Sequence, residues 1–244
     1  FQWTSTLNGT YLKNRVERLS GGENDFINGS SPAAGMVDYA TIIKPGEAIG
    51  TFWGYEWTGL DEKGHDTYTD VDGNQMIDGG DRKVIGKANP DFTLGWNNSL
   101  SYKNWDLSMQ FTSQLGFKIL NEPRAYYENN SHAYNRLKSV EEAPYGGQYT
   151  LSSSQPQTMV SYYLENGNFL KLTNLTIGYN FPFKNNKYIK NVRAYLSGDN
   201  LFCITGYSGL DPELSNPYPT YAGIDNRDKY PSIRSFTFGL NLTF

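Results

Sequence analysis

The stretch that decides the fold is Phe236-Thr237-Phe238-Gly239-Leu240-Asn241-Leu242-Thr243-Phe244. Side chains along a β-strand alternate between its two faces. One face of this stretch is therefore entirely apolar, and the other carries threonine, glycine and asparagine. A strand of an outer-membrane barrel has this pattern, because one of its faces meets lipid and the other a wet lumen. The stretch is predicted to be one strand of a barrel wall.

The composition of the 244-residue chain favours strands and turns over helices, since 15% of the residues are aromatic and 25 are glycine. The mean hydropathy is -0.60, and the absence of an apolar run of about 20 residues excludes a transmembrane helix. The net charge of -4 argues against nucleic acid as a partner. A single cysteine, Cys203, excludes an internal disulfide framework. Because Phe1 already lies in a strand pattern, we expect a fragment, a nicked product or a separate subunit.

Five further segments alternate in the same way as the terminal stretch. The predicted strands span about 1–16, 91–102, 104–116, 167–181, 189–203 and 232–244, separated by long extracellular loops at about 17–90, 118–166 and 205–231. Short and long connections alternate, as they do in outer-membrane barrels, and compact soluble domains rarely tolerate loops of this length. The sequence therefore predicts an all-β fold, a transmembrane antiparallel β-barrel segment. A β-sandwich, which gives the same alternation, is the alternative.

Two details qualify this prediction. The apolar face of the fourth strand, which includes Phe169 and Leu175, is interrupted by Lys171 and Thr173. Six strands are also too few to close a barrel, and open edges in lipid are costly because their backbone polar groups find no partner. The remaining strands of the wall must come from elsewhere.

Several motifs follow one another along nearly the whole chain. They include Gly50-Thr51-Phe52-Trp53-Gly54-Tyr55, Gly86-Lys87-Ala88-Asn89-Pro90-Asp91-Phe92, Gly167-Asn168-Phe169-Leu170-Lys171-Leu172, Gly198-Asp199-Asn200-Leu201-Phe202 and Gly209-Leu210-Asp211-Pro212-Glu213. In this order, the motifs resemble those of the SusC/RagA-type TonB-dependent transporters. The resemblance implies the last six strands of a 22-stranded barrel in the outer membrane of a Gram-negative bacterium of the Bacteroidota.

The resemblance also implies a function and partners. The function is nutrient import, with a SusD-like surface lipoprotein over the extracellular face and TonB acting on a plug domain. The plug domain is expected upstream and is absent from this chain. The expected cargo is glycan oligosaccharides, with peptides as the alternative, and no residue in the sequence chooses between them.

The acidic segment 70–81 has the most specific ligand-binding pattern in the sequence. Counted from Asp70, side chains with oxygen fall at positions 1, 3, 5, 9 and 12, the spacing of a calcium loop, to which a backbone carbonyl adds a ligand. The predicted ligands of a structural Ca²⁺ are Asp70, Asp72, Asn74, Met76, Asp78 and Asp81. Gln75 stands where such loops turn sharply at glycine, so Gly73 is the alternative turn residue. A solvated acidic loop is the alternative interpretation.

Tyrosines in two of the long loops are candidates for contact with cargo or with a lid protein, because aromatic rings stack on sugars and suit peptides. They are Tyr126, Tyr127, Tyr134, Tyr207 and Tyr218. Packing against neighbouring loops is the alternative for each. We find no sequence motif for a nucleophile or a phosphate loop, so no enzyme is expected. A secreted calcium-dependent carbohydrate-binding β-sandwich module is the alternative of another class.

Overall fold

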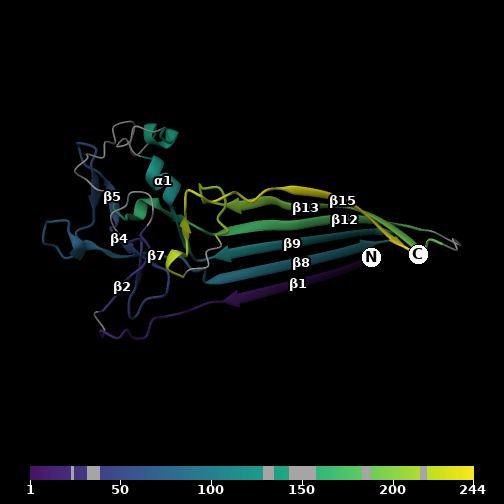
Figure 1. Ribbon diagram of the computed structural model, residues 1–244, viewed down its shortest axis with the longest axis horizontal. Coiled ribbons are helices and arrows are strands. Elements are labelled where there is room, and N and C mark those ends of the chain that lie inside the picture. Colours follow the sequence, from purple (N-terminus) through teal and green to yellow (C-terminus); the bar gives the residue numbers. More distant parts are fainter. Residues whose placement is uncertain (23–24, 32–38, 129–134, 143–157, 183–187, 215–218) are drawn as a thin grey trace.

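A six-stranded antiparallel sheet dominates the computed structural model, which describes residues 1–22, 25–31, 39–128, 135–142, 158–182, 188–214 and 219–244 (Figure 1). Its strands follow one another in chain order. They are β1 (Gln2–Tyr11), β8 (Phe92–Tyr102), β9 (Trp105–Leu115), β12 (Phe169–Phe181), β13 (Asn191–Thr205) and β15 (Ser235–Thr243). Neighbouring strands in the sheet are therefore also successive long strands of the chain, as in an up-and-down wall.

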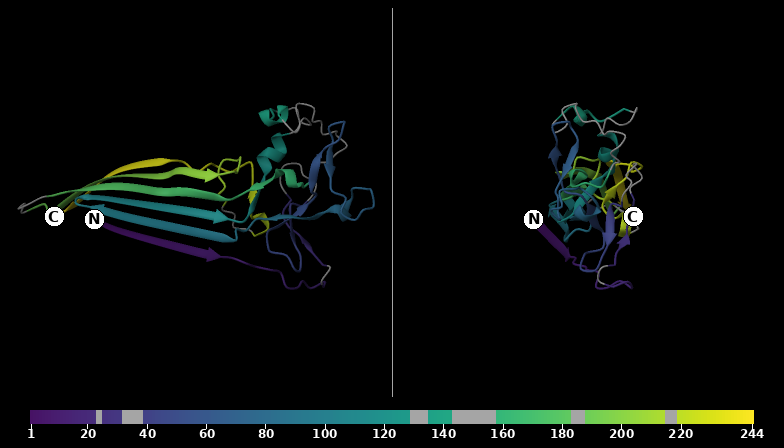
Figure 2. Two further views of the ribbon diagram at one scale, coloured as in Figure 1. Left: turned by 180° about the vertical axis from the view of Figure 1, so that it is seen from behind. Right: turned by 90° about the vertical axis from the view of Figure 1, so that its left-hand side faces the viewer.

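The long connections gather at one end of this sheet, and both termini lie at the other (Figures 1 and 2). We call these the loop end and the turn end. The loop end carries three small sheets. The first contains β2 (Ile27–Asn28), β3 (Thr41–Ile43), β4 (Thr51–Gly54) and β7 (Lys83–Lys87). The second contains β5 (Trp57–Leu60) and β6 (Asp66–Tyr68). The third contains β11 (Leu164–Asn166), β10 (Lys118–Asn121) and β14 (Ile224–Asp225).

The helical segments are short. They are α1 (Glu122–Tyr127) and the 3-10 turns η1 (Gly79–Asp81), η2 (Lys138–Glu141), η3 (Ser161–Tyr163) and η4 (Pro219–Tyr221). Within the described residues, no helix has the length and apolar character needed to cross a membrane.

One face of the large sheet is apolar and exposed. On β15, Phe236, Phe238, Leu240 and Leu242 are between 53% and 71% exposed. A soluble sandwich would bury these side chains against a second sheet, since that burial is its main source of stability. The alternative prediction of a β-sandwich is therefore wrong.

The opposite face is polar, and cross-strand pairs satisfy its charges. Arg193 Nε donates a 3.0 Å hydrogen bond to Oδ2 of Asp106, two strands away in the sheet. Asp199 accepts hydrogen bonds from Asn174 Nδ2 at 2.7 Å and from Ser235 Oγ at 2.8 Å. These charges stabilise the wall from its inner side.

A β-bulge explains the interruption in the fourth strand. The register of β12 shifts against both neighbours between Leu172 and Asn174. Against β9 the extra residue is Thr173, because Leu172 and Asn174 pair with the adjacent residues Phe111 and Gln110. Against β13 the extra residue lies in β13, between Asp199 and Phe202. Before the bulge, alternation places Phe169 and Lys171 on the polar, inner face, and it places Leu170 opposite the exposed Ile204 on the outer face. The prediction that Phe169 belongs to the same apolar face as Leu175 is therefore wrong.

Several strand bounds also differ from the predicted ranges. β1 ends at Tyr11 and not near residue 16, because Val16 exchanges backbone hydrogen bonds with Gly46 and Glu47 in the loop region. β13 continues to Thr205, and β15 begins only at Ser235.

The buried core lies at the loop end. One cluster, which includes Phe52, Leu120 and Met159, joins the small sheets to one another. A second cluster, formed by Phe117, Ile119, Phe169 and Tyr207, joins the loops to the inner face of the large sheet. The loops are therefore packed onto the wall by apolar contacts.

Candidate functional site

The acidic segment forms a tight loop held by its own carboxylates. Asp70 accepts hydrogen bonds from the backbone N–H groups of Gly73 at 2.6 Å and Gln75 at 2.9 Å. Gly73 and Gln75 both have positive φ angles, of 75° and 65°. The sharp turn therefore uses both positions considered in the sequence. A positive φ is uncommon for a residue other than glycine, and at Gln75 the backbone N–H is held in this conformation by its hydrogen bond to Asp70.

Asp81 closes the loop from its far end. Its carboxylate accepts hydrogen bonds from Val71 N at 2.7 Å and Asp78 N at 2.8 Å, and the residue is fully buried. The bonds from the backbone N–H groups of Asp78 and Val71 lower the pKa of Asp81 from its ordinary value. This carboxylate is therefore held as an anion.

Three of the predicted calcium ligands meet in space. One carboxylate oxygen from each of Asp70, Asp72 and Asp81 lies within 4.8 Å of the other two. Two ligands of one calcium ion are separated by at most twice a Ca–O distance of about 2.4 Å, so this spacing suits a single ion. The arrangement supplies three anionic oxygens to one point.

Asp78 lies outside this group of three carboxylates, and Asn74 and Met76 are the predicted neutral ligands. Asn74 Oδ1 accepts from Met76 N, and Asp78 Oδ1 accepts from Gly80 N, each at 2.7 Å. The Met76 side chain is 64% exposed, and its predicted contribution was a backbone carbonyl in any case. Asn74 and Asp78, like the three convergent aspartates, thus accept backbone hydrogen bonds within the loop.

The tyrosines predicted to contact cargo or a lid protein lie in different parts of the structure. Tyr126 and Tyr127 lie at the end of α1, where their rings meet edge to face at 4.8 Å. The Arg227 guanidinium lies 4.1 Å from the ring centre of Tyr126, within cation–π distance. Tyr134 and Tyr218 lie outside the described residues.

Tyr207 is buried in the second core cluster, with 6% exposure. Its hydroxyl donates a 2.5 Å hydrogen bond to Oδ2 of Asp225, which is itself buried. Burial raises the pKa of Tyr207 above its ordinary value. This placement argues against the predicted contact of Tyr207 with cargo.

Two ionic networks at the loop end were not predicted. The ammonium of the buried Lys171 donates to Asp211 Oδ2 at 3.2 Å and to Glu213 Oε2 at 2.8 Å, and so ties the Asp211-Pro212-Glu213 turn to the wall. Arg124 of α1 pairs with the buried Glu128 and with Glu165. The interrupted alternation at Lys171 was the sequence signal for the first network.

Known proteins with similar sequences match this chain over its whole length. The TonB-dependent receptor P3 of Formosa agariphila is 34% identical over 272 residues, and TonB-dependent receptor SusC of Bacteroides thetaiotaomicron is 30% identical over 261 residues. Each match covers 100% of this chain, and 27% and 24% of the respective relatives. The chain thus spans about a quarter of the length of the relatives it matches. No family model matches it.

Solved structures share the fold. The structure of the RagAB peptide transporter superposes with a TM-score of 0.77 at 24% identity, covering 99% of this chain and 27% of that chain. The RagAB peptide importer in the closed-closed state gives a TM-score of 0.78 at the same identity and coverage. By its sequence and its fold, the chain belongs to the SusC-type TonB-dependent receptors, and its sheet is an all-β segment of their barrel wall.

Proposed function

We propose that this chain is part of a TonB-dependent importer in the outer membrane of a Bacteroidota bacterium. The observation that carries the proposal is the two-faced sheet, exposed and apolar on one side and polar with paired charges on the other, in a chain of this family. Such a wall separates lipid from a wet lumen. TonB and a SusD-like lipoprotein are the proposed partners, and both act on the full-length receptor.

Glycan oligosaccharides are the proposed cargo. Partly buried aromatic rings gather at the loop end, where Trp57 and Tyr162 pack at 4.6 Å and Tyr55 and Tyr68 at 5.3 Å. Ring faces of this kind suit the apolar faces of sugars. Peptide cargo is the second candidate, favoured by the likeness to the RagAB peptide transporter.

The import function is tested by deleting the gene and supplying two fluorescently labelled pools, one of neutral and acidic oligosaccharides and one of short peptides. Loss of periplasmic label from the oligosaccharide pool, restored by the full-length gene, is the expected result. Loss from the peptide pool alone would replace the proposed cargo by peptide. Unchanged uptake of both pools would contradict import of either cargo.

We also propose that the acidic loop 70–81 holds a structural Ca²⁺. The three convergent carboxylates of Asp70, Asp72 and Asp81 support this proposal. Three negative charges at such short separation repel one another, and a hard divalent cation would offset that repulsion. The ion would order a loop whose Val71, Met76 and Ile77 side chains are all exposed.

A further inference from the structure

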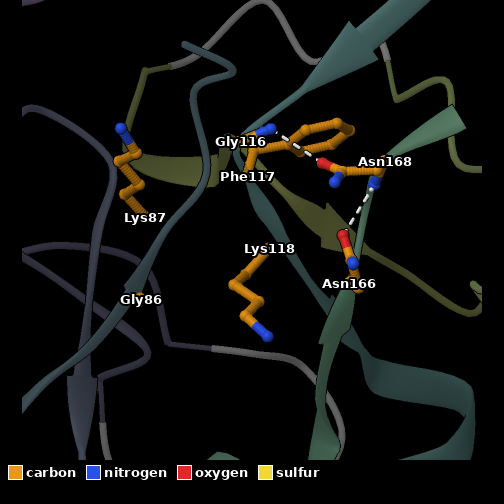
Figure 3. Close-up of a pocket in the computed structure, with 7 residues that line it drawn as sticks. All are labelled: Gly86, Lys87, Gly116, Phe117, Lys118, Asn166 and Asn168. Carbon is orange, nitrogen blue, oxygen red and sulfur yellow. Dashed lines mark hydrogen bonds between the residues drawn. The ribbon is translucent and has the colours of Figure 1, made fainter.

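A pocket of about 310 Å³ lies at the loop end, where β7 faces the β9–β10 and β11–β12 connections (Figure 3). Phe117, with 6% exposure, contributes an aromatic ring to its lining. Gly86 and Gly116 also line the pocket and leave room in it. A Cβ at Gly86 would lie only 3.0 Å from Lys118 Cγ, so a larger residue there would push the lysine stem aside.

The two asparagines of the pocket present hydrogen-bond donors. Asn168 Oδ1 accepts from Gly116 N at 2.7 Å, and Asn166 Oδ1 accepts from Asn168 N at 3.0 Å (Figure 3). Because a backbone N–H must meet an oxygen, these bonds fix the orientation of both amides. Their Nδ2 groups form no hydrogen bond with any described residue, so each has two N–H donors to offer.

The pocket also holds an uncompensated positive charge. Lys87 lies in the lining but pairs with Asp91, which offsets its charge. The ammonium of Lys118 forms neither an ion pair nor a hydrogen bond within the part of the chain that the structure describes. In Figure 3 the Lys118 side chain lies between Gly86 of β7 and Asn166. The side chains of the lining thus offer donors and one net positive charge, while both amide oxygens are occupied.

We propose that this pocket binds a carboxylate-bearing unit of the cargo, a conclusion that rests on the proposed import function. An ionised carboxylate is an acceptor-only group, which complements a lining of donors. The volume accommodates one sugar ring or one amino-acid residue. The carboxylate has two sources, a uronic acid of a glycan or the C-terminus of a peptide.

The test measures binding to the purified full-length receptor by titration calorimetry at low salt. The first pair of probes is trigalacturonic acid and neutral galactotriose. The second pair is a tripeptide of glycine with a free C-terminus and the same peptide amidated. Lys118→Gln removes the charge, and Lys63→Gln removes one lysine charge from the β5–β6 turn outside the pocket.

At least one carboxylated probe is expected to bind more tightly than its neutral counterpart. Lys118→Gln should weaken the binding of that probe about tenfold, as expected for loss of a charge-assisted hydrogen bond. The same substitution should leave binding of the neutral probe unchanged, and Lys63→Gln should leave binding of both probes unchanged. The pair that responds identifies the source of the carboxylate. The inference is overturned if neither carboxylated probe is preferred, or if the preference survives Lys118→Gln. Failure of cellular uptake with the preference intact would refute the import function alone.

Discussion

The ammonium of Lys171 lies 3.2 Å from Oδ2 of Asp211, and the two residues are 4% and 5% exposed. Lys171 lies on the wall strand β12, whereas Asp211 belongs to the connection between β13 and β14. A buried ion pair therefore fixes this loop to the inner face of the sheet. The pair exists because the bulge at Thr173, seen in the register with β9, places Lys171 inward.

Lys171→Ala is expected to loosen the loop without unfolding the wall. Removing the ammonium leaves the buried Asp211 carboxylate with only its hydrogen bonds from Ser232 Oγ and Glu213 N, and loss of one partner of a buried ion pair costs about 3–5 kcal/mol. Trypsin should then cleave after Arg227 and Lys229 faster than in the wild type, with heat-modifiable migration retained. Lys190→Ala, which removes a lysine at the turn end, is the matched control. Equal cleavage rates in the wild type and Lys171→Ala would show that the pair does not hold the loop.

Deleting Thr173 should block assembly of the wall. Without the extra residue, Lys171 would move to the outer, lipid-facing side and lose its ion pair with Asp211, and Leu170 would move inward. Thr173→Ala keeps the bulge and removes only the 2.9 Å hydrogen bond to the Gln110 carbonyl. The measurement is the folded fraction on unboiled gels. A deletion variant that folds as well as Thr173→Ala would refute this role of the bulge.

Removal of calcium should open the acidic loop. EDTA is expected to strip metal from the purified full-length receptor and to speed tryptic cleavage after Arg82, which follows the loop directly. Asp72→Asn should reproduce both effects, because Asp72 is exposed and contributes little else besides its bonds with Asn74. Asp61→Asn, outside the loop, serves as the control. Metal content that is the same in Asp72→Asn and the wild type would exclude the proposed site.

Lowering the pH should strengthen the small sheet formed by β10 and β14. Burial raises the pKa of Glu122 and of Asp225 above the ordinary values of 4.5 and 3.8. The folded protein therefore holds more protons than the unfolded one between the ordinary and raised values, and stability is lost as pH rises through that window. The nearby cations Arg227, 3.7 Å from Glu122, and Lys229, 4.0 Å from Asp225, reduce this effect without reversing it.

Hydrogen exchange measures this pH effect directly. The Leu120 amide, bonded to the Gly223 carbonyl at 2.8 Å, should be better protected at pH 5 than at pH 7 once intrinsic rates are corrected. The double variant Glu122→Gln and Asp225→Asn should flatten the dependence, and the exposed Glu62→Gln should not. Protection that rises with pH in the wild type would contradict the assigned directions.

The wall was predictable from sequence because strand alternation is local. Phe236 to Phe244 show a period of two that needs no knowledge of the partner strands. The acidic loop was predictable for a similar reason, since Asp70, Asp72 and Asp81 lie within twelve residues. Both patterns are read directly from neighbouring positions.

The remaining features depend on pairing between distant segments. The inward position of Lys171 follows from a bulge set by the register with β9 and β13. Burial of Tyr207 depends on Phe169 and Asp225. The lining of the pocket brings Lys118 together with Asn166 and Asn168, which lie some fifty residues further along the chain. The interrupted alternation at Lys171 indicates a change of face, but no local pattern in the sequence identifies the partners of these residues.

The most direct test of a lipid-facing wall is the size and heat-modifiability of the native polypeptide in detergent-extracted outer membrane. The 27.6-kDa chain spans 27% of a receptor relative, so a band of about 100 kDa that migrates faster unboiled is the predicted result. A discrete 28-kDa species that is soluble without detergent would contradict the account.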